Sequence, residues 1–338
     1  MELLDVAKSF GIGEISSISK INGGHINDTF VVESGSGKYI LQSLNSEIFP
    51  KPKTVMKNIA KLQRVFENQE QIYVQVPHYL YNSDNLNYTE NDGKIYRMYE
   101  FIESSEVYLN NKYRTAGFAF GSFIRILGGK NIKLEPAIKN YRSYSAYFAQ
   151  LVAADKNSSL KKIDSVIMRR LDSLEETLKQ VFTVDFPKRN IHGDAKISNI
   201  ILGKYTTVID LDTVMKGYAA IDYGDMIRSF CTSEKLNLTI IRDTTNGFAE
   251  GLNGTLNDDE IYSLYYGILY VTGELAVRYL TDYLSGGKYF KDKTASACLS
   301  RANELLRQLS VFISHGDEIT SIIYKAFKKS NLTCSMLI

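Results

Sequence analysis

Short runs of β-branched and aromatic residues mark the first third of the chain as rich in β-strands, because Gly, Asn and Ser separate one run from the next. The expected strands cover residues 15–21, 28–33, 38–43 and 94–101. Ser34-Gly35-Ser36-Gly37 lies between two of these runs and predicts a hairpin turn.

One helical segment interrupts the expected strands. Pro50 and Pro52 precede it, and Thr54 is the expected N-cap. Apolar residues then follow at helical spacing: Val55, Ile59, Leu62 and Phe66. The N-terminal part therefore predicts an antiparallel sheet with one helix packed on it.

The pattern changes after Glu103, where longer periodic segments begin. Helices are expected over residues 115–127, 141–154, 163–181, 257–284 and 294–314, with a brief return of strands in 190–211. An acidic start at Asn257–Glu260 and the pair Gly286-Gly287 delimit the longest helix. The expected fold class is α+β and two-lobed, with a small sheet-rich lobe in residues 1–103 and a larger, mainly helical lobe in 104–338.

Composition narrows the class of protein. The chain has 338 residues, 44% of them hydrophobic, which is enough for two cores. Its net charge of +2 gives no case for nucleic-acid binding, and the three separated cysteines suggest neither a disulfide framework nor a cysteine-based zinc site. Glu2 and Asp5 stand where a signal peptide would be basic, and no apolar run is long enough to span a membrane. We expect a cytoplasmic protein; the oligomeric state is left open.

The segment that carries chemistry is residues 189–217, RNIHGDAKISNIILGKYTTVIDLDTVMKG. Asn199 to Leu202 and Thr207 to Asp210 read as two strands of a hairpin around the turn Gly203-Lys204. The hairpin places Asn199 and Asp210 near adjacent strand ends, where both can offer oxygen ligands to one ion. Asp194 lies five positions before Asn199 and is expected to face the same point.

Three oxygen-bearing side chains at one point suit phosphoryl transfer. Mg²⁺ prefers a few carboxylate or amide oxygens together with phosphate oxygens and water. A free carboxylate can orient an acceptor hydroxyl and take its proton. The order His-x-Asp, four residues, Asn, then an Asp after a hairpin is the spacing of kinase catalytic loops. In the alternative interpretation, His192 and Asp194 are turn residues and Asn199 caps a bend.

With these residues in place, the chain resembles the aminoglycoside phosphotransferase and choline kinase superfamily and, within it, is similar to N-acetylhexosamine 1-kinases. The matching segments run nearly end to end: INGGHINDTFVV, KYILQSLNSEIFPKP, YRMYEFIE, HGDAKISNIIL, VIDLDTVMKGYAAIDYGDMIRS and ELAVRYLTDYLSGGKYF. The resemblance implies a protein-kinase-like fold and the use of ATP and Mg²⁺. It implies that Asp194 is the catalytic base and that Asn199 and Asp210 hold the metal. Asp212 is expected to point the same way along the strand and to assist the metal or touch substrate, or else to be a solvated or turn-stabilising residue.

The nucleotide is expected to meet the turn between the first two strands. Glycines there let the backbone approach phosphates, and the candidate residues are Gly23, Gly24, His25, Ile26 and Asn27. An ordinary hairpin turn is the alternative. Many kinases place a Lys on the third strand, where this chain has Gln42, as the sugar 1-kinases also do; Lys38, earlier on the same strand face, is a weak substitute for that charge.

The resemblance also assigns residues 98–102 to the hinge between the lobes. Backbone groups of Glu100 and Ile102 would then bond adenine, whereas Met98 and Tyr99 equally suit the core and surface of an edge strand.

The acceptor is expected on the helical side. Asp222 is expected to brace the catalytic loop, and Arg228 either contacts substrate or pairs with a carboxylate. Arg278 and Tyr289 resemble sugar-contacting positions, although Arg278 can also pair with Glu274 one helical turn earlier.

Three hypotheses about function follow. The first is a kinase acting on the anomeric hydroxyl of an N-acetylhexosamine or related sugar. The second keeps the fold and changes the acceptor to choline, homoserine or an aminoglycoside. The third, prompted by Gln42, is a regulatory pseudokinase that binds nucleotide without transferring phosphate.

Overall fold

The computed structural model describes residues 2–21, 27–69, 74–104, 111–130, 132–160, 162–232, 236–287, 289–290 and 294–335. Its contacts divide the chain into two compact units. The first unit comprises Met1–Asn110, Ile126–Lys139 and Asn199–Met215, and the second comprises Asn111–Arg125, Asn140–Ser198 and Lys216–Ile338. The predicted boundary after Glu103 stays a prediction.

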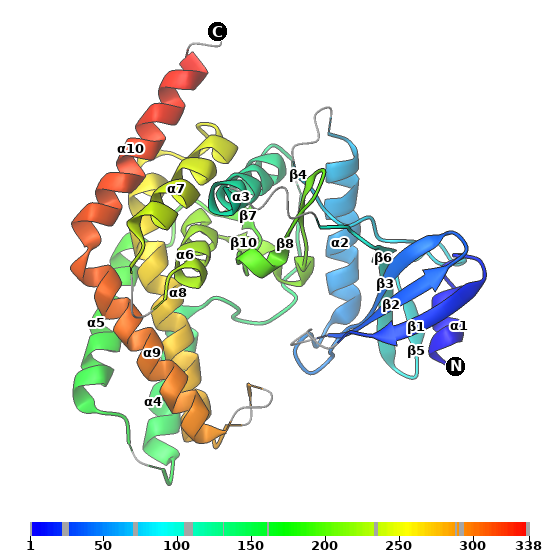
Figure 1. The fold of residues 1–338 in the computed structure, drawn as a ribbon. Coiled ribbons are helices and arrows are strands. Elements are labelled where there is room, and N and C mark those ends of the chain that lie inside the picture. The colour runs from blue at the N-terminus through cyan, green and yellow to red at the C-terminus, as the bar shows by residue number, and fades with distance from the viewer. Residues whose placement is uncertain are drawn as a thin grey trace. The chain divides into compact units, whose positions relative to one another are not determined.

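The first unit is built on an antiparallel five-stranded sheet of order β1-β2-β3-β6-β5 (Figure 1). The strands are β1 (Ile15–Lys20), β2 (Asp28–Ser34), β3 (Gly37–Ser43), β5 (Thr89–Asn91) and β6 (Lys94–Glu100). The predicted hairpin is confirmed, because Ser34 pairs with Gly37 across the β2–β3 turn. The alternative that Met98 and Tyr99 belong to an edge strand is wrong in its strand position, since β6 lies between β3 and β5. Met98 is nevertheless a core residue, as that alternative held.

Two helices belong to this unit, α1 (Leu3–Lys8) and α2 (Pro52–Glu67). Apolar residues of α1 and of the segment after it join β2, β3 and β6 in one core: Val6, Ala7, Phe10, Ile12, Val32, Leu41 and Met98. The predicted apolar face of α2 is confirmed, since Val55, Ile59, Leu62 and Phe66 are all buried. The predicted Thr54 N-cap is wrong, because the N-cap is Lys51 and α2 begins at Pro52. Proline is favourable in the first helical turn, where its missing N–H costs nothing.

A second, three-stranded sheet completes the first unit. Its order is β4-β9-β8, with β4 (Val74–Gln75), β8 (Ile200–Leu202) and β9 (Thr206–Val208). The predicted hairpin is confirmed, because β8 and β9 pair antiparallel with Ile200 opposite Val208. A short 3₁₀ turn flanks the β8–β9 hairpin on each side. The turn η2 (Ile197–Asn199) comes before β8, and η3 (Leu211–Thr213) comes after β9.

The second unit is mainly helical. It holds most of α3 (Lys112–Gly128) together with α4 (Tyr144–Asn157), α5 (Ser165–Val181), α6 (Ala219–Phe230), α7 (Leu238–Leu252), α8 (Asp258–Leu284), α9 (Ala295–Ser314) and α10 (Gly316–Ser335). A two-stranded sheet joins β7 (Arg189–Ile191) with β10 (Met215–Gly217). The expected α+β class, with a helical part larger than the sheet-rich part, is confirmed.

The long helix α8 organises this unit, because α4, α5, α6, α9 and α10 all pack against it. The predicted start is confirmed: Asn257 caps the helix and forms a reciprocal capping box with Glu260. Helices α6 and α8 cross closely at Gly224 and Gly267, where a Cβ on Gly224 would lie 2.2 Å from the Gly267 carbonyl oxygen. This close crossing fixes the polar residues of α6 against those of α8.

The described part of the chain holds no helix with the length and apolar character needed to cross a bilayer.

Candidate active site

The predicted catalytic loop follows β7 in the second unit. His192 is fully buried, with its ring edge-on to Phe120 and Phe123 at centroid distances of 5.3 and 5.8 Å. Gly193 has a φ of +80°, a conformation that glycine adopts without steric cost. The buried histidine therefore anchors the loop, and the glycine turns the chain so that Asp194 follows immediately.

Asp222 of α6 binds the backbone of the catalytic loop. Its two carboxylate oxygens accept hydrogen bonds from the backbone N–H groups of His192 at 2.7 Å and Gly193 at 2.8 Å. The predicted bracing role of Asp222 is confirmed. Burial raises the pKa of Asp222 to about 6, although the two backbone donors act in the opposite direction.

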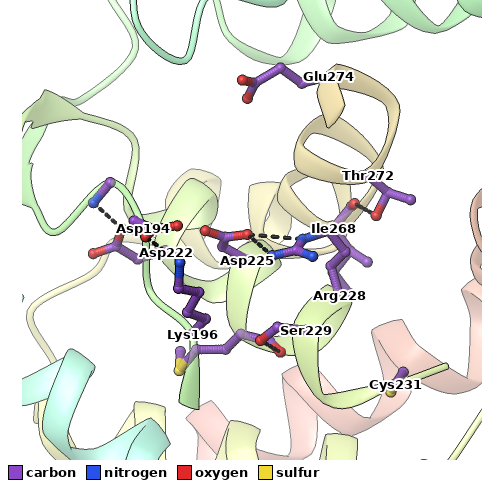
Figure 2. A network of polar contacts seen from close by, with 12 residues as sticks. Asp194, Lys196, Asp222, Asp225, Arg228, Ser229, Cys231, Ile268, Thr272 and Glu274 are labelled. Carbon is purple, nitrogen blue, oxygen red and sulfur yellow. Dashed lines mark hydrogen bonds and ion pairs between the residues drawn. The ribbon is translucent and has the colours of Figure 1, made fainter. Parts of the chain in front are cut away.

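Asp194 has a partly open carboxylate, with its side chain 20% exposed. Burial alone would raise its pKa, but the positive charges of Lys196 and Arg142 outweigh that effect and lower the pKa to about 2. The Lys196 Nζ lies 2.8 Å from one Asp194 carboxylate oxygen. Figure 2 draws the two side chains beside each other. Asp194 is therefore ionised across the neutral pH range and able to accept a proton.

Arg142 is a site residue that the sequence did not reveal. Its side chain is 5% exposed, and its Nη2 lies 3.8 Å from an Asp194 oxygen and 2.5 Å from Asp225 of α6. Its Nη1 donates to Glu274 of α8 at 3.2 Å, and its Nε donates to the Gly193 carbonyl at 2.7 Å. One buried guanidinium thus faces three carboxylates and the catalytic loop.

The sequence carried a misleading signal at this position. A helix was expected from Tyr141, yet α4 begins at Tyr144 with Ser143 as its N-cap. Arg142 instead has a φ of +58°, so it lies in the turn before the helix. Only the tertiary structure brings its charge to Asp225 and Glu274.

Three of the predicted acceptor residues, Arg228, Arg278 and Tyr289, belong to the second unit, whereas Asp212 belongs to the first. Arg228 donates twice to one Asp225 oxygen, at 2.9 and 2.6 Å, so its predicted pairing with a carboxylate is confirmed (Figure 2). Arg278 lies 3.6 Å from Glu274, which confirms the expected pairing along the helix. Arg278 also donates to the Tyr289 hydroxyl at 2.9 Å, so two of the predicted acceptor residues meet directly.

Aromatic rings surround the Arg278 guanidinium. Its central carbon lies 5.1 Å from the ring centre of Tyr147, 5.4 Å from Tyr289 and 5.7 Å from Phe290. The cation therefore occupies the face that these rings would otherwise offer to a positively charged ligand.

The predicted metal ligands lie in the first unit, at one end of the β8–β9 hairpin. The Ile209 N–H donates to the Asn199 carbonyl at 3.0 Å, and Asp210 follows directly. Asp210 has a φ of +61°, an uncommon left-handed conformation that turns the chain out of the strand direction. An amide and a carboxylate oxygen at one hairpin end fit the ligand preference of Mg²⁺. Within the described ranges, no group of three or more His, Cys, Asp or Glu side chains is placed to hold a metal ion by itself.

Asp212 is not on a strand, so its predicted strand geometry is wrong. It lies in η3 and is 2% exposed. Its carboxylate forms a two-pronged pair with the Arg97 guanidinium, in which the second hydrogen bond measures 3.1 Å. The Asn27 amide donates to the same carboxylate at 2.9 Å. Both Asp212 oxygens therefore have protein partners, and its substrate role stays a prediction.

Gln42 belongs to the same buried cluster. Its amide oxygen accepts from Arg97 Nε at 3.0 Å, and its amide nitrogen donates to Thr29 at 3.2 Å. Lys38, at the start of β3, has its amino group 4.3 Å from the centre of the Phe101 ring. The cation beside Gln42, the position where many kinases carry a lysine, is therefore Arg97 of β6.

The remaining nucleotide residues stay predictions. Glu100 ends β6, and its N–H donates to the His78 carbonyl at 3.4 Å. Ile102 is half-buried just beyond the strand. Gly23, Gly24, His25 and Ile26 lie outside the described residues. Asn27 is described, and its side-chain oxygen accepts from the Asn45 N–H at 3.0 Å.

The structure thus gathers the predicted residues into two groups. Asp194, Arg228, Arg278 and Tyr289 share one polar network in the second unit, and Asn27, Gln42, Asn199, Asp210 and Asp212 lie in the first unit. Convergence of the two groups on one point stays a prediction.

Comparison with known proteins identifies the family. Residues 17–251 match the family model described as the phosphotransferase enzyme family, APH. The chain belongs to this family and is a small-molecule phosphotransferase with a kinase-like fold.

Solved structures confirm that fold. The amicoumacin kinase hAmiN, in complex with AMP-PNP, Ca²⁺ and Ami, is 13% identical, with 92% of this chain and 94% of that chain covered and a TM-score of 0.63. A microcompartment-associated aminopropanol kinase is 12% identical, with 94% and 99% covered and a TM-score of 0.66. The choline kinase from Cryptosporidium parvum Iowa II is 13% identical, with 95% and 99% covered and a TM-score of 0.60.

Proposed function

We propose that the chain is an ATP- and Mg²⁺-dependent kinase that phosphorylates the anomeric hydroxyl of an N-acetylhexosamine or a related sugar. Asp194 is the base, and Asn199 and Asp210 hold the metal. The observation that carries the proposal is the Asp194 carboxylate, which stays ionised beside two cations and is partly open to solvent. An ionised, fixed carboxylate can orient an acceptor hydroxyl and remove its proton as the hydroxyl attacks.

The nucleotide side rests on the first unit. Bound Mg²⁺ would neutralise charge on the phosphate oxygens. In the proposal, the adenine meets the backbone of Glu100 and Ile102, and the phosphates meet the turn from Gly23 to Asn27. Gln42 lies at the third-strand position and holds Arg97 through its amide oxygen. Arg97 is buried, so its contribution is to fix Gln42 and Asp212.

The contacts of the proposed acceptor residues favour a sugar over a cationic alcohol. Choline-type acceptors need aromatic faces or carboxylates free to meet a positive charge. Here the Arg278 guanidinium already covers three rings, and its charge would repel a second cation. Arg278 and the Tyr289 hydroxyl instead offer hydrogen bonds of the kind that neutral sugar hydroxyl and acetamido groups use. Arg228 and Asp212 remain further candidates for substrate contacts.

An acceptor screen tests this proposal. The chain would be incubated with ATP and Mg²⁺ and with single acceptors: N-acetylglucosamine, N-acetylgalactosamine, glucose, galactose, choline, aminopropanol, homoserine and an aminoglycoside. ADP release is the readout, and phosphorus NMR assigns the phosphorylated position. We expect turnover with N-acetylhexosamines and an anomeric phosphate as the product.

Turnover with amino alcohols and none with any hexose would contradict the sugar assignment and favour the second acceptor class. ATP binding without transfer to any acceptor would favour the regulatory pseudokinase. The amine-bearing class is retained as the alternative because the similar structures include an aminopropanol kinase and a choline kinase.

A further inference from the structure

Arg142 holds the residue directly before Asp194 from the carbonyl side. Its Nε donates to the Gly193 carbonyl at 2.7 Å, and the Tyr141 hydroxyl donates to the same oxygen at 3.1 Å. On the other side, Asp222 accepts from the Gly193 N–H at 2.8 Å. Both the N–H and the carbonyl group of Gly193 are therefore held by hydrogen bonds. These bonds also fix the orientation of the backbone at Asp194.

The other nitrogens of Arg142 join two helices to this loop. Nη2 donates to Asp225 of α6 at 2.5 Å, and Nη1 donates to Glu274 of α8 at 3.2 Å. A guanidinium presents its donors in a rigid planar fork, whereas a lysine ammonium is a single charged point. Only an arginine can therefore meet the loop carbonyl and both carboxylates at once.

Each carboxylate that is hydrogen-bonded to Arg142 also pairs with a second arginine. Asp225 also pairs with Arg228, and Glu274 also lies beside Arg278, whose guanidinium bonds Tyr289. The Arg142–Asp194 distance of 3.8 Å is too long for a hydrogen bond, so this contact is an electrostatic one. A continuous set of contacts thus leads from Asp194 through Arg142 and Glu274 to the Arg278–Tyr289 pair.

The backbone at Arg142 is in an unfavourable conformation. Its φ of +58° is uncommon for a residue with a long side chain, and strained positions of this kind persist where the surroundings over-determine them. Here the hydrogen bonds of the Arg142 guanidinium hold the backbone in this conformation.

We propose that Arg142 is a positioning residue of the reaction, which sets Asp194 in register with the acceptor residues Arg278 and Tyr289 by holding Gly193, Asp225 and Glu274 together. This proposal rests on the proposed function, in which Asp194 is the base and Arg278 and Tyr289 meet the acceptor. Arg142 does not itself touch the reacting atoms.

The test compares Arg142→Lys and Arg142→Met with Arg125→Lys. Arg125 is a matched control, because its Nε also donates to a backbone carbonyl, that of Gly251, at 2.9 Å. With the acceptor found in the screen, we expect kcat of Arg142→Lys to fall about 100-fold, the order of loss that a misplaced catalytic group produces. The KM for ATP should change less than about twofold, the KM for the acceptor should rise, and Arg125→Lys should match the wild type.

Two further readouts separate positioning from a structural role. The acid limb of the kcat profile should move to higher pH in Arg142→Met, which loses a positive charge, and stay in place in Arg142→Lys. Hydrogen exchange of residues 190–196 should accelerate in both variants. Rates are compared at a temperature where circular dichroism shows each variant folded; if Arg142→Met does not fold, Arg142→Lys carries the test.

A kcat for folded Arg142→Lys within about threefold of the wild type, or unchanged exchange of the loop, overturns the proposal. The exchange measurement needs no acceptor. If the wild type transfers phosphate to nothing, the proposed function has failed, while accelerated or unchanged exchange still decides whether Arg142 holds the loop.

Discussion

The Arg97 guanidinium and the Asp212 carboxylate form a two-pronged ion pair in the interior of the first unit, with both side chains 1% exposed. Breaking a buried pair leaves one charge without its partner. We therefore expect Arg97→Met to lower the free energy of unfolding by about 3–5 kcal/mol in urea titrations.

The double variant Arg97→Met/Asp212→Leu should lose less stability than Arg97→Met, because it leaves no buried charge unpaired. Glu90→Gln is the control: Glu90 pairs with Lys53 at 2.6 Å but is 51% exposed, so its loss should cost less than about 1 kcal/mol. Equal losses for the buried and the exposed pair would contradict this interpretation.

Asp222→Asn should loosen the catalytic loop. The carboxylate accepts two backbone N–H groups, whereas an amide has one acceptor oxygen and would turn a donor toward the second N–H. We expect a loss of about 1–3 kcal/mol in unfolding free energy and faster hydrogen exchange at His192 and Gly193. The exposed Asp185→Asn is the control, and equal effects of the two variants would count against the bracing role.

Protonation of Asp222 adds a separate pH dependence to the stability of the wild type. The pKa of Asp222 is raised from 3.8 to about 6 by burial, so the folded state binds the proton more tightly than the unfolded state. Its contribution to stability is then fully present below pH 4 and decreases as the pH rises toward 6. The stability difference between wild type and Asp222→Asn should therefore shrink over that interval; a difference that grows would contradict the raised pKa.

Lys196→Met should move the acid limb of turnover to higher pH. The Lys196 charge opposes the effect of burial and helps to hold the pKa of Asp194 at about 2. Without that charge the pKa rises, so a larger fraction of Asp194 is protonated at acidic pH. Because the folded pKa lies below the ordinary value of 3.8, Asp194 stabilises the fold above that value and loses this contribution as the pH falls toward 2.

The matched control for that variant is Lys179→Met. Lys179 is an exposed lysine of α5 that pairs with Glu175 and Glu176. Profiles of kcat, measured from pH 9 down to the lowest pH at which both variants stay folded, should show a shifted acid limb for Lys196→Met alone. Coincident profiles for both variants over that whole range would show that Lys196 does not tune Asp194.

Tyr289→Phe should weaken acceptor binding while ATP use stays normal. The change removes the hydroxyl that accepts from Arg278 at 2.9 Å and keeps the ring beside the guanidinium. A hydrogen bond between the Tyr289 hydroxyl and a neutral acceptor contributes about 0.5–1.5 kcal/mol, so we expect the acceptor KM to rise about two- to tenfold.

Tyr262→Phe is the control, since Tyr262 is also exposed and shares its hydroxyl hydrogen bond with Tyr266 at 2.8 Å. A rise in the KM for ATP, or the same rise in both variants, would argue against an acceptor role for Tyr289.

Local patterns were sufficient for much of the fold. The apolar spacing from Val55 to Phe66, the Asn257 cap and the Ser34–Gly37 turn all act over a few residues, so the sequence displays them directly. The start of α2 was predicted wrongly because two local signals for a helix N-terminus lie close together. Thr54 is a good cap in isolation, but Pro52 is already a favourable first-turn residue, and the helix starts there.

The polar site was predictable only where it follows a motif. Asp194, Asn199 and Asp210 stand at a fixed spacing, and Asp222 follows from the resemblance. Arg97 and Arg142 could not be found this way, because each pairs with carboxylates many positions away in the chain. Asp212 was placed on a strand because alternation was assumed to continue past Asp210, whose positive φ ends it.

The substitution Asp194→Asn removes the carboxylate on which the proposed reaction depends. With the acceptor identified in the screen, turnover is measured by ADP release and ATP affinity by calorimetry on the same preparation. If Asp194 is the base, turnover falls by a factor of about 100 to 10,000, the usual contribution of a general base, while the Kd for ATP stays within a few-fold of the wild type. Near-normal turnover in Asp194→Asn would contradict that role of Asp194.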